Sequence, residues 1–303
     1  MQKDILLSGG TGLIGRALRK MLAQEGRDCR LLLRHPLHAE AENLSWNPDA
    51  GLIEDERLGG FKAVVHLAGE PIAARRWTPE QKQKIRDSRV KGTRLLAERL
   101  ARCPEKPEVL LCASAIGFYG NRGDEVLTEA SDGGSGFLAE VTQEWEAAAQ
   151  AAKEAGIRVV HARFGIVLSK DGGALAKMLP AFQLGLGGPL GDGSAYMSWI
   201  SIDDTAAALQ HLLSDPEAEG VYNLTAPDPV PNRDFVKAMG KALHRPAFLP
   251  APAFALRGLL GEMGETLLLH SARVLPKRLE AQGFTFRHPE LLPALQDLCH
   301  RIQ

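Results

Sequence analysis

Glycines near the start of the sequence have the spacing of a loop that binds the phosphates of a dinucleotide. Residues 9–15 read Gly9-Gly10-Thr11-Gly12-Leu13-Ile14-Gly15, which contains both G-x-G-x-x-G and G-x-x-G-x-x-G. Such a loop needs glycine for a tight turn, for close approach of the backbone to a pyrophosphate, and for close packing of helix on strand. Free N–H groups at the start of the following helix complete an anion site. The residues predicted to bind the cofactor here are Gly9, Thr11, Gly12, Leu13, Ile14 and Gly15.

A glycine-rich turn between a strand and a helix also occurs without any ligand, so the motif alone is a weak signal. Its context in the sequence strengthens the prediction of a cofactor site. An apolar segment, Asp4–Ser8, precedes the loop, and an amphipathic helical pattern, Arg16–Gly26, follows it. Strand, glycine loop and helix in this order are typical of a Rossmann-type dinucleotide-binding unit.

The end of the second expected strand indicates which dinucleotide binds. NAD-specific sites place Asp or Glu there, about 20 residues after the glycines, to accept hydrogen bonds from the ribose. This strand ends Leu31-Leu32-Leu33-Arg34-His35-Pro36, without an acid. The planar guanidinium of Arg34 can instead pair with a 2′-phosphate, although an arginine at a strand end is often only solvated. We therefore predict NADP as the cofactor in preference to NAD.

Short β-rich segments alternate with helical patterns as far as Leu168, which predicts an α/β fold with a doubly wound parallel sheet. The second helix has a clear start, with Thr78 as N-cap and Pro79 in the first turn. The expected strands are Asp4–Ser8, Arg30–Arg34, Ala63–Ala68, Val109–Ser114 and Arg158–Phe164, and the expected helices are Arg16–Gly26, Thr78–Cys103 and Phe137–Ala155.

After Leu168 the alternation weakens. Gly185–Gly193 holds five glycines and one proline, which predicts a loop. A strand-like segment (Met197–Ile202), a helical one (Asp203–Ser214) and another strand-like one (Gly220–Leu224) follow, before a helix-rich C-terminal third. We expect residues 1–168 to form the NADP-binding Rossmann domain. Residues 169–303 are expected to form a smaller substrate-side α/β lobe, partly interleaved with the first.

Composition argues against several other classes of protein. The chain has 303 residues, 45% hydrophobic and 24% charged, as in ordinary globular proteins. Its formal net charge is −1, so it has no excess of basic residues such as nucleic-acid-binding proteins carry. The four scattered cysteines fit a reducing compartment. Because neither a signal peptide nor an apolar stretch of about 18 residues is present, we expect a soluble, cytoplasmic protein without membrane contacts.

Other catalytic chemistries lack their sequence patterns. His35 and His38 are the only close pair among nine histidines, and no third ligand lies near them. The chain has no G-x-S-x-G elbow and no G-x-x-x-x-G-K-[ST] loop. We therefore expect no metal site, no serine hydrolase chemistry and no nucleoside-triphosphatase chemistry.

Several motifs together resemble the extended short-chain dehydrogenase/reductases, which are nucleotide-sugar epimerases and their relatives. They are residues 8–15, Val65-His66-Leu67-Ala68-Gly69, Ser88-Arg89-Val90-Lys91-Gly92-Thr93 and Ser114-Ala115-Ile116-Gly117-Phe118-Tyr119-Gly120. Further segments resemble an atypical epimerase-like branch of that family, which carries a C-terminal domain of unknown function. These are Arg75-Arg76-Trp77, Gly187-Gly188-Pro189-Leu190-Gly191, residues 197–204 and Leu275-Pro276-Lys277-Arg278.

This resemblance implies further cofactor-binding residues. Leu67, Ala68 and Gly69 would pass under the cofactor, and Arg89 would contact it from a helix, unless Arg89 is only an exposed helix charge. Ile166 would lie where the backbone turns toward the cofactor after the sixth strand. The resemblance also implies a small-molecule substrate such as a nucleotide-sugar. It further allows a homodimer through the helices Thr78–Cys103 and Phe137–Ala155.

The catalytic residues are where the resemblance fails. Typical members use Tyr-x-x-x-Lys on a helix, in which lysine lowers the tyrosine pKa so that tyrosine can move a proton. Here Phe137 and Val141 stand at those two positions, and neither has an ionisable group. Aligning the chain on Tyr119 places Ala115 at the usual Ser/Thr position, with Ser114 one residue away.

Ser114 and Tyr119 remain the candidate catalytic residues. Glu140 and Asp204 are alternative acids, each with an equally ordinary structural interpretation. Met197 and Trp199 are candidate walls of a substrate pocket, although such residues commonly belong to the core. Two functions stay open. One is an NADP(H)-binding epimerase-like enzyme or oxidoreductase for a nucleotide-sugar or other small polar substrate. The other is a non-catalytic NADP(H)-binding protein with a redox-sensing or regulatory role.

Overall fold

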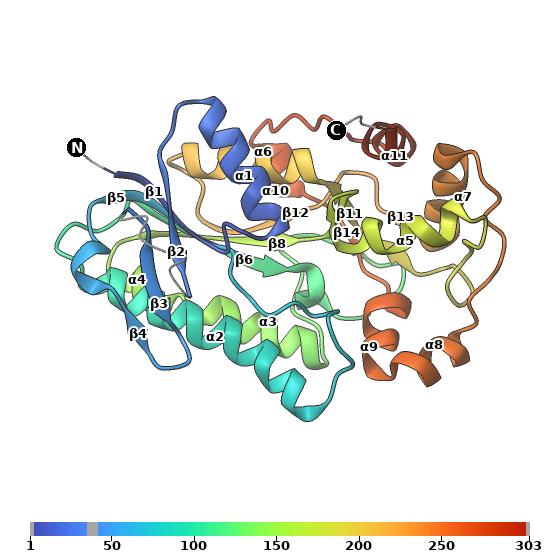
Figure 1. The fold of residues 1–303 in the computed structure, drawn as a ribbon, viewed down its shortest axis with the longest axis horizontal. Coiled ribbons are helices and arrows are strands. Elements are labelled where there is room, and N and C mark those ends of the chain that lie inside the picture. Colours follow the sequence, from blue (N-terminus) through green and yellow to red (C-terminus); the bar gives the residue numbers. More distant parts are fainter. Residues whose placement is uncertain (1–2, 35–41, 301–303) are drawn as a thin grey trace.

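The computed structural model describes residues 3–34 and 42–300. Within these ranges the chain is organised around an eight-stranded sheet in the order β12-β8-β6-β5-β1-β2-β3-β4. Every neighbouring pair is parallel except β3 and β4. The chain winds outward from β1 in both directions (Figure 1), so the predicted doubly wound α/β fold is confirmed.

The strands carry apolar side chains on both faces because helices cover both sides of the sheet. In β1, Leu6 and Leu7 point to opposite faces and both are fully buried. The strands predicted for this sheet are confirmed, with ends shifted by a residue or two. The segment predicted as one strand over Met197–Ile202 is instead divided into two short strands outside this sheet. The strands of this sheet are β1 (Lys3–Ser8), β2 (Cys29–Leu33), β3 (Leu44–Asn47), β4 (Leu52–Ile53), β5 (Phe61–His66), β6 (Val109–Ala115), β8 (Arg158–Phe164) and β12 (Gly220–Leu224).

Helices cover the sheet in two layers, with α1 and α6 on one face and α2, α3 and α4 on the other (Figure 1). Thr78 caps α2 as predicted, since its side chain accepts the N–H of Gln81. The prediction of one helix over Phe137–Ala155 is wrong. The N–H of Ala149 bonds three residues back to Glu146, which tightens the chain into a turn between α3 and α4. These helices are α1 (Leu13–Gln24), α2 (Pro79–Arg102), α3 (Phe137–Ala147), α4 (Gln150–Glu154) and α6 (Ile202–Ser214).

Most of the remaining elements form a smaller lobe at the other end of the molecule (Figure 1), with a core that includes Phe182, Trp199 and Phe235. The short helix α10 (Lys277–Ala281) instead packs against β12 of the main sheet. Gly185–Gly193 contains no helix or strand, as predicted. Both β12 and α6 follow residue 168 in sequence but belong to the main sheet and its helical layer. The other elements are β7 (Val126–Leu127), β9 (Ile166–Ser169), α5 (Gly173–Gln183), β10 (Tyr196–Met197), β11 (Trp199–Ser201), β13 (Val230–Pro231), α7 (Asn232–Leu243), α8 (Ala253–Leu260), α9 (Glu262–Gly264), a π-helical turn (Glu265–Leu269), β14 (Arg273–Val274), α10 (Lys277–Ala281) and α11 (Leu291–His300).

None of the helices in the described ranges combines the length and the apolar character that crossing a bilayer requires.

Candidate cofactor and substrate site

The glycine loop lies at the carboxyl edge of the sheet, where the strand order reverses between β1 and β5. Gly9 has φ +72°, and a Cβ there would lie 2.6 Å from the carbonyl carbon of Leu67. A Cβ on Gly15 would lie 2.3 Å from the carbonyl oxygen of Gly9, so α1 packs directly against the loop. We call residues 9–15, together with the start of α1, the cradle. Thr11 and Gly12 within it are exposed, and its backbone fits the pyrophosphate of a dinucleotide.

Other predicted cofactor residues border the same edge. Leu67, Ala68 and Gly69 directly follow β5, next to the glycine loop, and Gly69 is exposed. Arg34 is exposed and directly follows β2, the neighbour of β1. The structure therefore places the segments that follow β1, β2 and β5 at the same edge of the sheet, although they are distant in sequence.

Arg89 is a half-buried cation beside this edge. A Cβ on Gly69 would lie 3.5 Å from Arg89 Cζ. The Arg89 Nη1 donates to the carbonyl oxygens of Glu70 at 3.0 Å and Ile85 at 3.1 Å. Burial lowers the pKa of Arg89 to about 10, which leaves the guanidinium charged at neutral pH. The hydrogen bonds go to neutral carbonyl groups, and the charge of the nearby Glu70 partly offsets the effect of burial on the Arg89 pKa.

By the resemblance, Phe137 and Val141 stand at the usual Tyr and Lys positions; Phe137 is half-buried and Val141 is buried. Phe137 begins α3 and makes an edge contact with Trp77, with ring centroids 5.1 Å apart. Lys82 Nζ lies 4.6 Å from the centroid of the Phe137 ring. Neither Phe137 nor Val141 can transfer a proton, so any proton transfer at this end of α3 needs another group.

Ser114 and Tyr119 belong to one buried polar network. The Ser114 hydroxyl donates to Glu146 Oε1 at 2.5 Å. Arg163 donates twice to the Glu146 carboxylate, each time at 2.7 Å, and once to the Tyr119 hydroxyl oxygen at 3.0 Å. The Tyr119 hydroxyl lies 2.8 Å from Asn223 Oδ1. Both candidate hydroxyls are thus held by protein partners.

The environment of this network keeps Tyr119 protonated and Arg163 charged. Tyr119 is fully buried, and burial raises its pKa even though the neighbouring Arg163 lowers it. Burial lowers the pKa of Arg163, but the hydrogen bonds and charge of Glu146 outweigh that effect and raise it overall. No motif in the sequence pointed to Glu146 or Asn223, because an acid inside a helix and an amide inside a strand have no distinctive pattern.

The predicted substrate residues lie in the smaller lobe. Trp199 is fully buried in its core, and the indole N–H donates to the carbonyl oxygen of Asp228 at 2.9 Å. Ile166 pairs with Trp199 across two short parallel strands and is half-buried. Met197 is also half-buried, with its sulfur 3.3 Å from Asn232 Nδ2. Of these three side chains, Trp199 has no surface open to a ligand.

The two alternative acids have protein partners of their own. Glu140 is exposed and lies 3.6 Å from Arg86. Asp204 is buried near the start of α6 and accepts hydrogen bonds from the Ser201 hydroxyl and from the backbone N–H groups of Arg287 and His288. These contacts join α6 to the C-terminal segment and place Asp204 in a structural role.

Asp203, His288 and Asp297 together have the composition of a metal site, but each already has a protein partner. Ligand atoms of Asp203, His288 and Asp297 lie within 4.8 Å of one another. However, His288 Nε2 lies 2.9 Å from Asp297 Oδ2, and the Arg287 guanidinium lies 3.9 Å from both aspartates. Both carboxylates therefore already have protein partners.

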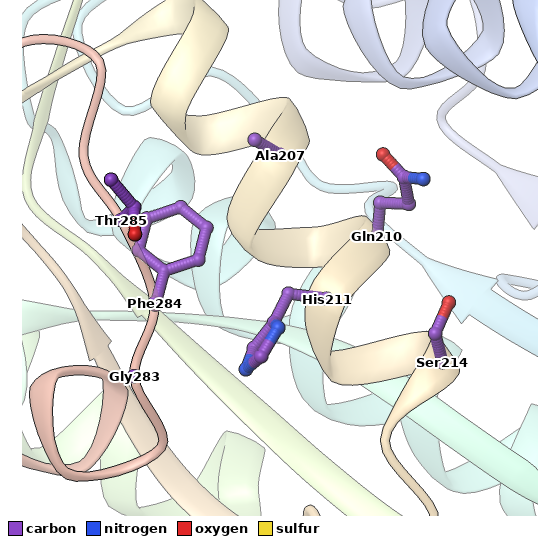
Figure 2. Close-up of a pocket in the computed structure, with 7 residues that line it drawn as sticks. All are labelled: Ala207, Gln210, His211, Ser214, Gly283, Phe284 and Thr285. Atoms are coloured by element: carbon purple, nitrogen blue, oxygen red, sulfur yellow. The ribbon is translucent and has the colours of Figure 1, made fainter.

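A cavity of about 370 Å³ lies at the opposite edge of the sheet. Figure 2 shows His211 of α6 beside the chain segment that carries Phe284. Arg158, the first residue of β8, donates to the carbonyl oxygen of Leu212 at the end of α6. Because β8 starts at the amino edge of the sheet, this cavity is separate from the glycine loop. Its lining residues are Ala207, Gln210, His211, Ser214, Gly283, Phe284 and Thr285.

Comparison with known sequences agrees with this arrangement. Residues 5–225 match the NAD dependent epimerase/dehydratase family, and residues 251–298 match a domain of unknown function, DUF1731. The chain is 42% identical over 292 residues to an epimerase family protein of Mycobacterium bovis, with 96% of each chain covered.

Solved structures show the same likeness in three dimensions. The human epimerase family protein SDR39U1, crystallised with NADPH, is 34% identical and superposes with a TM-score of 0.90, covering 99% of this chain and 100% of that chain. A structure described as the nucleoside-diphosphate sugar epimerase from Corynebacterium glutamicum is 34% identical with a TM-score of 0.81. That match covers 98% of this chain and 58% of the other.

Proposed function

Because the chain belongs to the NAD-dependent epimerase/dehydratase family, we propose that it binds NADP(H) and uses it in oxidoreductase or epimerase-like chemistry on a small polar substrate. A nucleotide-sugar is the first candidate. The observation that carries this proposal is the side-chain-free cradle at the carboxyl edge, in which Gly9 approaches Leu67 and Gly15 approaches Gly9. Glycine loses more conformational freedom on folding than any other residue, and it is used where the backbone must turn tightly or approach a ligand closely.

The relatives support both parts of the proposal. The human protein, crystallised with NADPH, shares 34% of its residues with this chain and nearly all of its length. The Corynebacterium glutamicum structure carries the description of a nucleoside-diphosphate sugar epimerase. Arg34 adds an independent reason to favour NADP, since a guanidinium pairs well with a phosphate.

We assign the following roles to the residues of the chain. Backbone N–H groups of the glycine loop hold the pyrophosphate, Arg34 pairs with the 2′-phosphate, and Arg89 supplies positive charge near Gly69. Leu67, Ala68 and Ile166 line the cofactor, while residues 169–303 form the substrate side, where Asn232 contacts both Met197 and Leu190 of the Gly185–Gly193 loop. A bound nicotinamide would give or accept a hydride. For Ser114 and Tyr119 we propose a positioning role through Glu146 and Arg163.

A non-catalytic redox sensor is the second candidate. One observation favours it, namely that Phe137 and Val141 cannot transfer protons and that the Tyr119 hydroxyl is buried among protein partners. A sensor needs only a cofactor site whose occupancy alters the surface of the protein.

Hydride transfer distinguishes the two functions. The purified protein would be loaded with NADPH deuterated at C4 and incubated with a panel of carbonyl compounds and nucleotide-sugars. Deuterium appearing in any product supports the enzyme. Tight NADPH binding without transfer to any compound supports the sensor, and an absence of measurable NADPH binding contradicts both.

A further inference from the structure

Lys82 links helix α2 to helix α9 through an ion pair. It lies in the first turns of α2, and its Nζ donates to both carboxylate oxygens of Glu262 in α9, at 2.9 and 3.0 Å. Glu262 lies within the stretch that matches the domain of unknown function. The same Nζ lies 4.6 Å from the centre of the Phe137 ring. The Lys82 ammonium group therefore lies beside the residue that, by the resemblance, stands at the usual position of the catalytic tyrosine.

Helix geometry places Lys82 and Arg89 on the same face of α2. The two residues are seven positions apart, which is about two helical turns, so they share one face of α2 at a separation of about 10 Å. Arg89 approaches Gly69 after β5, where the cofactor is proposed to pass. Because α2 begins at the carboxyl edge of the sheet, Lys82 is the member of this pair nearer the substrate side.

We propose that Lys82 is the proton-transferring group of this site, held in place by Glu262, and that it takes over the role that Phe137 cannot perform. This inference rests on the proposed enzymatic function. In the reductive direction, the substrate carbonyl carbon receives the hydride with its electron pair from the reduced nicotinamide. The carbonyl oxygen takes a proton from Lys82 Nζ. The products are an alcohol, oxidised cofactor and neutral lysine, which regains a proton from solvent.

The ion pair explains why Lys82 remains usable for chemistry. Its side chain is 30% exposed and that of Glu262 is 48% exposed. Ion pairs as exposed as this one contribute little to stability. Glu262 thus fixes the position of the ammonium group at little cost, and solvent can restore its proton. In this arrangement one group of the acid–base pair comes from each lobe.

Chemical labelling tests the location of Lys82 without requiring turnover. Lys91 is a matched control, because it lies on the same helix and forms an ion pair of the same length, 2.9 Å, with Asp87. Reductive methylation would be quantified by mass spectrometry with and without NADPH. We expect NADPH to slow methylation of Lys82 several-fold and to leave Lys91 unchanged. Equal methylation of Lys82 in both samples would place it away from the nicotinamide and overturn the inference.

Substitution then tests the chemistry. Lys82→Arg keeps the positive charge and the contact with Glu262, but a guanidinium does not release a proton at neutral pH. We expect kcat to fall about 100-fold or more, with the NADPH Kd and Tm unchanged, while Lys91→Arg behaves as wild type. If the wild type transfers hydride and the Lys82→Arg variant has the same kcat, this inference is wrong and the proposed function stands. A wild type that binds NADPH but transfers no hydride removes the proposed function, and the proton-transfer step with it.

Discussion

The hydroxyl of Ser8 lies 2.6 Å from Nδ1 of His66, at the carboxyl ends of the neighbouring strands β1 and β5. Both side chains are buried. Ser8 directly precedes Gly9, and His66 directly precedes Leu67, so this hydrogen bond ties together the two chain segments that form the cradle. His66 also makes an edge contact with Trp46, with ring centroids 5.6 Å apart.

This pair makes stability depend on pH. Burial lowers the pKa of His66 to about 4, below the value of about 6.5 in an unfolded chain. The unfolded state therefore binds the proton more readily, and stability falls as pH decreases from about 6.5 toward 4. We expect the free energy of unfolding, from urea titration, to drop by about 2–3 kcal/mol between pH 7 and pH 4.5 through His66 alone.

The variant His66→Asn isolates this effect, because asparagine keeps a hydrogen-bonding partner for Ser8 and does not titrate. It should be less stable than wild type at pH 7 but should lose less stability on acidification. Burial also lowers the pKa of His161, so part of the acid sensitivity remains in the variant. Parallel stability curves for wild type and His66→Asn would show that His66 is not buried in its neutral form.

Gly9→Ala should abolish NADPH binding. Its φ of +72° is unfavourable for alanine, and the new Cβ would lie 2.6 Å from a backbone atom of Leu67. Gly26→Ala is the matched control, since Gly26 has φ +70° but nothing within 4 Å of a Cβ. The control should lose only about 1 kcal/mol of stability and bind NADPH as wild type does, measured by fluorescence titration. Equal effects of the two substitutions on binding would contradict the cradle.

Arg34→Ala should discriminate between the two nicotinamide cofactors. Charge-assisted hydrogen bonds contribute about 1.5–3 kcal/mol, so the NADPH Kd should rise about 10- to 100-fold. The NADH Kd, measured on the same variant, should stay nearly constant because NADH has no 2′-phosphate. A parallel loss of affinity for both cofactors would mean that Arg34 supports the fold of the site and does not read the phosphate.

Glu146→Gln should destabilise the protein strongly. Glu146 pairs with Arg163, whose side chain is only 4% exposed, and removal of the carboxylate leaves a buried charge without compensation. Breaking such pairs costs about 3–5 kcal/mol. The double variant Glu146→Met with Arg163→Met should be markedly more stable than Glu146→Gln, because neither charge remains. Urea denaturation at pH 7 measures both, and a mild effect of Glu146→Gln would show that water reaches the pair.

The glycine cradle and the sheet were predictable because the signals for them are local. Glycine at positions 9 and 15 itself indicates a tight turn and close backbone packing, and strand β1 is recognisable from a few consecutive apolar residues. Thr78 and Pro79 likewise mark the start of α2 within four positions of the chain. Such features depend on interactions between near neighbours in sequence, so residue type and spacing are enough to specify them.

Other features depend on contacts between residues that are remote in sequence. Lys82 and Glu262 are 180 positions apart, and Tyr119 and Asn223 are 104 apart. Nothing near Glu146 indicates that it binds Ser114 and Arg163, and nothing near Trp199 distinguishes a core residue from a pocket wall. Residue types thus determined that the chain has a dinucleotide cradle with an arginine beside it. Only the packing of distant segments decided which polar groups are buried together and which cation lies beside Phe137, because burial and pairing are properties of the folded neighbourhood.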